Sequence, residues 1–261
     1  MLKRYNRVSM EARVIEQISR INREFYQEFA GSFSATRQRI QPGAARLLAR
    51  APRQNHWLDI GCGNGNLAAA WLELGCTGRF LGCDWSESLL RDARVKVGAR
   101  KLPEGTQMEF QRRDVAAMDW TDGLPSGAWD RLSTLAVLHH IPSRQRREQF
   151  CQQMHALLCP QGEAYLSVWQ LFNSPRLRER IQPWEMTGLT EADVEAGDVL
   201  MDWRAGSWDG QPAAGLRYVH VFSEEELTDL ARMSGFVVAE SFFSDGKTGN
   251  LALYQTWEKR N

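Results

Sequence analysis

The amino-acid sequence predicts an α/β fold with a doubly wound, mostly parallel seven-stranded sheet, N-terminal helices and a long insertion after the fifth strand. Three observations predict this fold. Short apolar segments alternate with segments of helical periodicity between residues 54 and 170. A glycine-rich loop follows the first apolar segment, and two further apolar segments close the chain around a turn. Such alternation is typical of a parallel sheet with helices on both faces.

Residues 1–53 form the N-terminal helical arm that we expect before the sheet. Its apolar residues recur at the three- and four-residue spacing of an amphipathic helix: Ile15, Ile18, Ile21, Phe25 and Phe29. A second, shorter helix is expected over 43–50, before Pro52. The arm holds 11 Lys and Arg against 4 Asp and Glu, so it could meet a polyanion or dock on the acidic residues 181–261.

Five strands and three helices are expected to alternate through the core. The strands are predicted over 56–60, 79–83, 108–112, 131–137 and 164–169. The helices are predicted over 66–74, 87–98 and 143–158, with a turn at 160–162. After a helix over 223–234 that opens with a capping box, strands over 236–242 and 251–257 complete a sheet of seven.

Residues 171–217 interrupt this alternation. The segment is rich in Gly, Pro and Trp and shows little periodicity. A loop of this length inside a compact domain is usually a functional lid or a mobile segment. We therefore expect a domain over 54–261 that carries a lid-like insertion at 171–217.

Several kinds of protein and site are disfavoured by the composition. The apolar runs are far too short to span a membrane, and the charged N-terminal segment lacks the apolar region of a secretion signal. The five cysteines include no CxxC pair, so we expect no structural metal site. These features predict a cytoplasmic protein with free thiols.

The loop Gly61-Cys62-Gly63-Asn64-Gly65 follows the first predicted strand and opens a helix. Glycines let a backbone turn tightly and approach a ligand closely, and the helix N-terminus offers free N–H groups. Asp84 ends the second predicted strand, 19 residues after Gly65, where a carboxylate can accept both ribose hydroxyls of an adenosine. Ligands of open α/β sheets bind at this edge, so the pattern predicts a site for a nucleoside-containing cofactor.

Three neighbouring features narrow the cofactor. Asp59 lies in the first strand just before the loop, where it can hold the loop and face a ligand's ammonium group, whereas phosphate-binding loops avoid a carboxylate there. Arg113-Asp114-Val115 follows the third strand and places Asp114 for an adenine amino group. Trp129-Asp130 leads into the fourth strand, and Val137-Leu138-His139-His140 leaves it.

Together these residues resemble the Rossmann-like class I S-adenosylmethionine-dependent methyltransferases over 56–170. The alternative is a plain dinucleotide-type domain without this cofactor. The resemblance implies an enzyme that uses S-adenosylmethionine. The cofactor contacts it implies come from Arg37, Asp59, Gly61, Gly63, Gly65, Asp84, Trp85, Asp114, Val115 and Leu135.

Three stretches outside these motifs resemble the tRNA wobble-uridine carboxymethyl methyltransferases, which esterify a carboxymethyl group on an anticodon uridine. The stretches are 25–37, 137–147 with its His pair and arginines, and 197–203 combined with 216–222. The resemblance implies tRNA as a partner and a small accessory protein as a second. The insertion residues that it implies for substrate binding are Asp198, Trp203 and His220.

A carboxylate acceptor suits the residues at hand. Its pKa is about 4, so at neutral pH it is ionised and needs no general base. Arginine pairs with a carboxylate through two parallel hydrogen bonds, and we predict Arg37 and Arg217 as this clamp, with His140 as a third catalytic group. The alternatives are that Arg37 binds the cofactor's own carboxylate, that Arg217 pairs with Asp198, and that His140 is a packed wall of the site.

Two other functions stay open at the level of sequence. The first is a methyltransferase of a small-molecule carboxylate or hydroxyl, which would share the whole core. The second is a non-catalytic module that binds the cofactor or RNA, and it would be expected to have a degraded glycine loop. The loop is intact in this sequence.

Overall fold

A seven-stranded sheet lies at the centre of the protein. The computed structural model describes residues 10–29, 31, 39–204 and 214–260. The sheet order is β3-β2-β1-β4-β5-β10-β9. The strands are β1 (Gln54–Ile60), β2 (Thr77–Asp84), β3 (Gln107–Arg112), β4 (Trp129–Leu135), β5 (Leu158–Trp169), β9 (Phe236–Ser244) and β10 (Ala252–Lys259). The first five strands are parallel, and β10 runs antiparallel to β5 and β9.

The strand order reverses at β1, which pairs with β2 on one side and with β4 on the other. A crevice forms at such a switch point because the connections from the two adjacent strands leave in opposite directions. The segments that follow β1 and β4 therefore face one another at the carboxyl edge of the sheet. This edge is where the sequence predicts the cofactor site.

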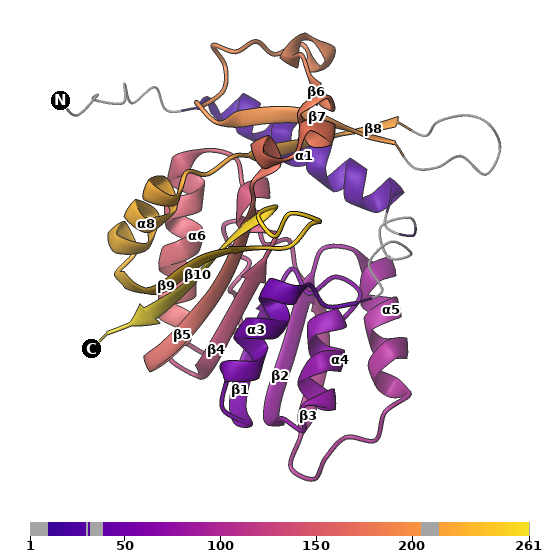
Figure 1. Ribbon diagram of the computed structural model, residues 1–261, viewed down its shortest axis with the longest axis vertical. Coiled ribbons are helices and arrows are strands. Elements are labelled where there is room, and N and C mark those ends of the chain that lie inside the picture. Colours follow the sequence, from indigo (N-terminus) through magenta and orange to yellow (C-terminus); the bar gives the residue numbers. More distant parts are fainter. Residues whose placement is uncertain (1–9, 30, 32–38, 205–213, 261) are drawn as a thin grey trace.

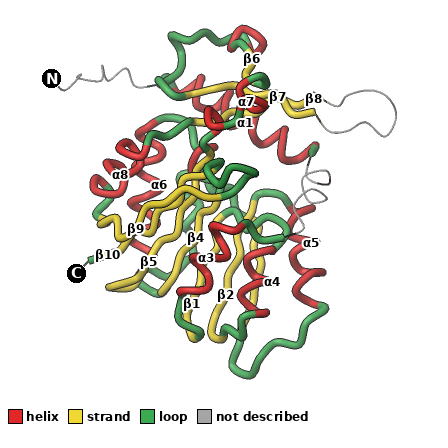
Figure 2. Tube along the Cα trace, viewed as in Figure 1, coloured by secondary structure: helices red, strands yellow, loops and turns green. Residues whose placement is uncertain are grey.

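Helices cover both faces of the sheet (Figures 1 and 2). On one face lie α3 (Pro42–Arg50), α4 (Asn66–Glu73) and α5 (Glu87–Gly98), around a core that includes Trp57, Trp71 and Phe80. On the other lie α6 (Arg144–Leu157) and α8 (Glu224–Met233), around a core that includes Trp129, Phe150 and Trp257. Two buried layers on one sheet are the doubly wound architecture, so the predicted fold class is confirmed.

The insertion contains a second, antiparallel sheet, which the sequence did not lead us to expect. It is formed by β6 (Ile181–Gln182), β7 (Asp198–Arg204) and β8 (Ala214–His220), and helix α1 (Ala12–Glu28) packs against β8. The connection from β5 includes the short helix α7 (Pro175–Arg178). Figure 1 shows this sheet and α1 above the core strands.

Strand β7 was missed because both of its faces are buried. Leu200 packs in a cluster with α1, whereas Val199 and Met201 pack in another with Leu171, after β5. A strand buried on both faces lacks the alternation of apolar and polar residues that identifies a half-exposed strand. The insertion is therefore an ordered layer over the core where it is described. Its action as a lid remains a prediction.

The bounds of the core elements agree closely with those expected from the sequence. Helix α5 has the predicted bounds, and the turn predicted at 160–162 lies within β5, where Gln161 has a φ of 64°. The register between β4 and β5 shifts at this point, so the turn is an irregularity inside one strand. Within the described part of the chain, no helix combines the length and the apolar character needed to cross a lipid bilayer.

Candidate active site

The glycine loop turns over the carboxyl end of β2. The N–H groups of Gly61 and Cys62 both donate to the Cys83 carbonyl, at 2.7 and 2.9 Å, and Gly65 N–H donates to the Cys62 carbonyl at 3.1 Å. Gly65 precedes α4 directly. The free N–H groups of the first turn of that helix therefore lie beside the loop, where they can donate to a bound ligand.

Gly63 and Gly65 both have left-handed backbone conformations, with φ values of 53° and 74°, but their surroundings differ. A Cβ placed on Gly65 would lie 2.8 Å from Cβ of Ala93 on α5. A Cβ placed on Gly63 would meet no described atom within 4 Å. Gly65 therefore serves the packing of α4 on α5, whereas no described atom fills the space beside Gly63.

Alanine substitutions at these two glycines should have different effects. Both should lose about 1 kcal/mol of folding free energy because a side chain disfavours the left-handed region. Gly65→Ala should lose more folding free energy than Gly63→Ala, because Ala93 must move to admit the new methyl group. Gly63→Ala should chiefly weaken cofactor binding, because its methyl group would enter the space beside the loop. Thermal unfolding and calorimetry with S-adenosylhomocysteine on both variants would check this, and equal losses of affinity at equal stability would contradict it.

Asp84 at the end of β2 connects the loop to the next helix. Its Oδ2 accepts from Gly63 N–H and its Oδ1 from Ser86 N–H, both at 2.9 Å. Ser86 in turn caps the N-terminus of α5. Burial raises the pKa of the Asp84 carboxyl, although the bonds from Ser86 and Gly63 favour its ionised form. The carboxylate is thus fixed beside the open space at Gly63, where it can accept ribose hydroxyls.

Asp59 is buried one strand away. Its Oδ1 accepts from the Ser133 hydroxyl on β4 at 2.6 Å, and that hydroxyl accepts from Trp57 Nε1 at 2.8 Å. The pKa of Asp59 is raised to about 7: burial is the main cause, the Ser133 hydrogen bond opposes it, and the charge of Asp84 adds to the increase. A cationic group placed beside Asp59 would favour its ionised form.

The remaining residues predicted to bind the cofactor lie half-buried along the same edge. Trp85 is stacked against the guanidinium of Arg112, 4.4 Å from the ring centroid. Asp114 follows β3, accepts from Ala116 N–H and lies 3.5 Å from Arg23 Nη1 of α1. Val115 follows it, and Leu135 ends β4. The structure therefore brings these residues to the carboxyl edge, together with Asp59, Asp84 and the glycine loop.

Arg217 occupies a cage of aromatic rings. It is buried on β8, and its guanidinium carbon lies 4.4 Å from the ring centroid of Trp169 and 5.3 Å from those of Phe25 and Trp203. Trp169 ends β5 at the carboxyl edge of the core sheet. Nε1 of Trp203 is buried and has no hydrogen-bond partner among the described residues. The arrangement gathers a cation and an indole donor beside the edge that carries the cofactor site.

His140 lies half-buried in the short helix after β4, next to Trp169. Its Nδ1 is 2.9 Å from the Tyr218 carbonyl, which can only accept, so Nδ1 carries a proton. Its Nε2 lies 2.7 Å from the Tyr26 hydroxyl of α1. Both ring nitrogens thus contact the protein. This geometry favours the role of an ordered wall over that of a base.

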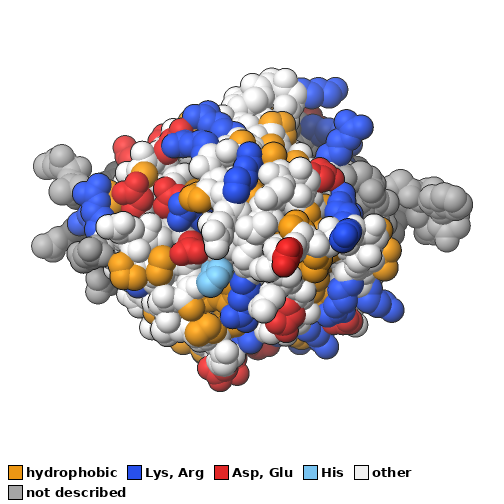
Figure 3. Space-filling view, turned by 90° about the horizontal axis from the view of Figure 1, so that it is seen from below, with side chains coloured by type: hydrophobic (Ala, Val, Ile, Leu, Met, Phe, Trp, Pro, Cys, Tyr) orange, Lys and Arg blue, Asp and Glu red, His pale blue; other side chains and the backbone are white. Residues whose placement is uncertain are grey.

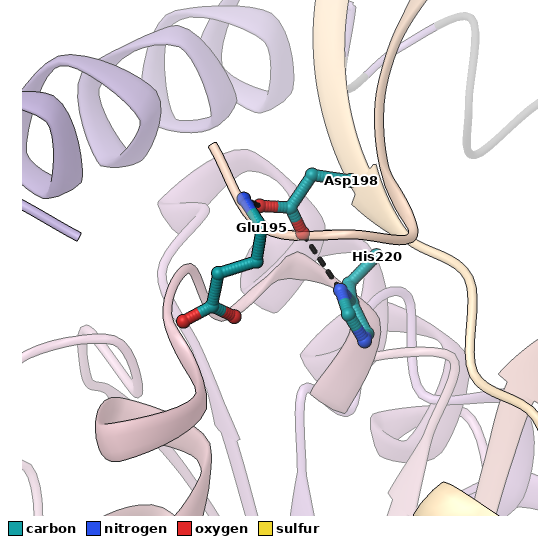
Figure 4. A group of neighbouring side chains, drawn as sticks. All are labelled: Glu195, Asp198 and His220. Carbon is teal, nitrogen blue, oxygen red and sulfur yellow. Dashed lines mark hydrogen bonds and ion pairs between the residues drawn. The ribbon is translucent and has the colours of Figure 1, made fainter. Parts of the chain in front are cut away.

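Asp198 and His220 are buried, and they bond each other instead of facing an open site. The carboxylate of Asp198 points at the ring of His220, with 2.7 Å between Oδ1 and Nδ1 (Figure 4). Asp198 also accepts from the Tyr218 hydroxyl, so it is not the partner of Arg217 that one alternative required. Glu195, Asp198 and His220 each offer an atom that could ligate a metal ion, and these atoms lie within 4.8 Å of one another. However, Arg147 Nη2 donates a hydrogen bond to Glu195 at 2.7 Å. A cation of the protein therefore already neutralises the group.

Three residues with contacts in this region, Asn22, Tyr26 and Arg147, were not among the predicted site residues, although Tyr26 and Arg147 lie in the stretches that carry the resemblance. Asn22 of α1 accepts from Tyr218 N–H at 2.8 Å, and Tyr26 lies one helical turn further along the same helix. Arg147 stands in a run of charged residues that resembles an exposed helix face, and only its tertiary partners show that it is buried. The spacing of Asn22 and Tyr26 on one helix face was the one available signal. Arg37 lies outside the described residues.

A sheet of this strand order, with the glycine loop after β1 and an acidic residue at the end of β2, defines the class I S-adenosylmethionine-dependent methyltransferases. A methyltransferase domain family model matches residues 58–164. A protein of Encephalitozoon cuniculi named as a putative methyltransferase is 30% identical over 236 residues, which are 90% of this chain and 93% of that protein. The chain belongs to the S-adenosylmethionine-dependent methyltransferases, and the predicted enzyme class and cofactor are confirmed.

Two further relatives carry more specific names. The tRNA (carboxymethyluridine(34)-5-O)-methyltransferase of Schizosaccharomyces pombe is 24% identical over 225 residues, which are 83% of this chain and 89% of that protein. The protein of the same name from Macaca fascicularis, ALKBH8, is 31% identical over 160 residues, 60% of this chain. The match covers 21% of ALKBH8, so this chain corresponds to about a fifth of its length.

Solved structures share the fold at low sequence identity. The 1,6-didemethyltoxoflavin-N1-methyltransferase of Burkholderia thailandensis, solved with S-adenosylhomocysteine, aligns with a TM-score of 0.64 at 20% identity, over 95% of this chain and 91% of that one. A methyltransferase solved in complex with the Trm112 methyltransferase activator of Haloferax volcanii aligns with a TM-score of 0.61 at 15% identity, over 92% and 97%. Both likenesses concern the fold alone.

Proposed function

We propose that this methyltransferase esterifies the carboxymethyl group of a tRNA wobble uridine. The observation that carries the proposal is the position of Arg217, a buried cation at the carboxyl edge, beside the donor Nε1 of Trp203. The names of the Schizosaccharomyces pombe and Macaca fascicularis relatives support the same acceptor. A cation and a neutral donor suit a carboxylate better than they suit a hydroxyl.

The residues divide the task between cofactor and acceptor. S-adenosylmethionine, when bound, supplies an electrophilic methyl group. Asp84 and the glycine loop would hold its adenosine, and Arg217 would hold the acceptor carboxylate as an ion pair away from water. Because a carboxylate is already ionised, no side chain has to remove a proton, which agrees with the occupied ring nitrogens of His140.

We place the tRNA at the end of the molecule that carries the second sheet. Figure 3 shows the opposite end, where basic, acidic and hydrophobic side chains are interspersed and neither sign of charge predominates. Near the carboxyl edge, Arg176 and Arg178 of α7 and the nearby Phe172 are exposed. Exposed arginines can contact phosphates, and an exposed ring can stack on a base.

We also propose a cytoplasmic location and a small accessory protein as a partner, as in the Haloferax volcanii complex.

The acceptor can be tested with anticodon stem-loops and labelled S-adenosylmethionine. We expect methylation of a stem-loop that carries carboxymethyluridine and none of the same stem-loop with plain uridine, because only the former offers the carboxylate. The purified chain should be assayed alone and with a Trm112-type activator. Equal labelling of both stem-loops would contradict the carboxylate acceptor. Labelling of a small acid, with no labelling of RNA, would identify a small-molecule methyltransferase instead.

A further inference from the structure

A buried network of charged groups lies on one face of the second sheet. Asp198 of β7 accepts at Oδ1 from His220 Nδ1 and from the Tyr218 hydroxyl, at 2.7 and 2.8 Å. Its Oδ2 accepts from Glu195 N–H at 2.9 Å. Tyr218 and His220 both belong to β8. The network therefore fixes the two strands of the sheet to each other on this face.

The same network continues into the core domain. His220 Nε2 lies 2.9 Å from Glu226 Oε1 on α8. Arg147 of α6 donates to Glu195 at 2.7 Å and to the Tyr218 hydroxyl at 3.3 Å. Two helices that cover the core sheet thus hold β8 through directional bonds. Such bonds specify a position more narrowly than apolar contacts do.

The surroundings of His220 require its imidazolium form. Each ring nitrogen faces a carboxylate oxygen, and a carboxylate can only accept, so both nitrogens must donate. Burial and the Arg147 cation oppose this charge, but the hydrogen bonds to Asp198 and Glu226 outweigh them and raise the pKa of His220. Among the described residues, the charged and titratable groups around it are Arg144, Arg147, Glu195, Asp198, Tyr218 and Glu226.

Arg217 lies on the opposite face of the same strand. Side chains alternate between the faces of a strand, so Tyr218 points into the network while Arg217 points at Trp169. Val199, Met201 and Val219 pack with Leu171 on this face of the sheet, and the rings of Phe25, Trp169 and Trp203 surround the guanidinium of Arg217. The directional bonds of Tyr218 and His220 on the other face hold β8, and so they help to set how far Arg217 reaches toward Trp169.

We propose that His220 is a positioning residue of the acceptor site, which as an imidazolium holds β8 at the depth where Arg217 meets the acceptor carboxylate. The proposal rests on the acceptor role of Arg217 proposed above. Loss of the His220 proton would leave a nitrogen lone pair against a carboxylate. The pKa of His220 is raised in the folded protein. The stabilisation from its hydrogen bonds to Asp198 and Glu226 is therefore fully present below about pH 6.5, the pKa of an unfolded histidine, and is lost as the pH rises through the pKa of the folded state.

The test is the pH dependence of KM for the carboxymethyluridine stem-loop between about pH 6.5 and about pH 8.5. In the wild type, KM should rise roughly three- to tenfold with pH while the Kd of S-adenosylhomocysteine stays constant. His220→Gln cannot titrate, so its KM should be high at both ends and flat. Glu226→Gln removes one carboxylate charge and should move the midpoint to lower pH. His56→Gln, at an exposed position of β1, should behave as the wild type.

A purely structural role would change stability without moving the midpoint, so an unmoved midpoint in Glu226→Gln, or a pH-dependent KM in His220→Gln, would overturn the proposal. Hydrogen exchange of residues 214–220, corrected for intrinsic rates, gives a readout that needs no acceptor. Protection should fall with pH in the wild type and be low throughout in His220→Gln. If no stem-loop is methylated at any pH, the proposed function fails, and this measurement still decides whether His220 holds β8.

Discussion

Replacement of Arg217 by methionine is expected to lower kcat/KM for the carboxymethyluridine stem-loop by roughly 10- to 150-fold, because an arginine that pairs with a carboxylate contributes about 1.5–3 kcal/mol. Methionine keeps apolar bulk among the rings of Phe25, Trp169 and Trp203 while it removes the charge. The affinity for S-adenosylhomocysteine should stay near that of the wild type, since we predict that other residues hold the cofactor.

Arg217→Lys separates charge from shape. A lysine keeps the positive charge but cannot form two parallel bonds to a carboxylate, and it stacks poorly on aromatic rings. We expect it to restore only a small part of the activity lost in Arg217→Met. Steady-state kinetics on both variants, with thermal unfolding as a check of the fold, would measure this. Full activity in Arg217→Met, or full rescue by lysine, would rule out the two-bond clamp.

The core and the position of the candidate cofactor site at its carboxyl edge could be predicted from the sequence because local signals specify them. The glycines at 61, 63 and 65 have left-handed conformations and directly follow the end of a strand. A short segment of sequence is therefore enough to predict the loop. Asp84 follows from the same logic, since it ends the second strand. Helix α5 has a capping serine at Ser86 and a regular apolar stripe, and its bounds agree with those expected.

The second sheet and its network could not be predicted in the same way. The partners of Arg147 come from segments 48 and 71 residues further along the chain, and no local pattern reports such pairings. The sequence predicted Asp198 and His220 as substrate-binding residues, but a sequence cannot tell a buried ion pair from two groups that face a ligand. The difference depends on whether α6 and α8 supply counter-charges, which is a property of the folded chain.

Asp84→Ala is the second substitution with a large expected effect, and it should chiefly lower the affinity for the cofactor. The change removes the acceptor for Gly63 N–H and the acceptor that we predict for the ribose hydroxyls, at a cost of about 1–3 kcal/mol or roughly 5- to 150-fold in Kd. Calorimetry with S-adenosylhomocysteine measures this loss. Asp229→Ala, which removes an exposed acid of α8, is the matched control and should bind as the wild type does.

The stability of Asp84→Ala provides the independent check. The pKa of Asp84 is raised in the folded protein, mainly by burial, so its ionised form opposes folding, and this opposition grows as the pH rises above about 4. Removing the carboxylate relieves that opposition and partly offsets the lost bonds to Gly63 and Ser86. We therefore expect the Tm of the variant without cofactor at neutral pH to change little, while its affinity for the cofactor falls strongly. Unchanged affinity, or a loss of affinity that merely follows a large loss of stability, would remove Asp84 from the cofactor site.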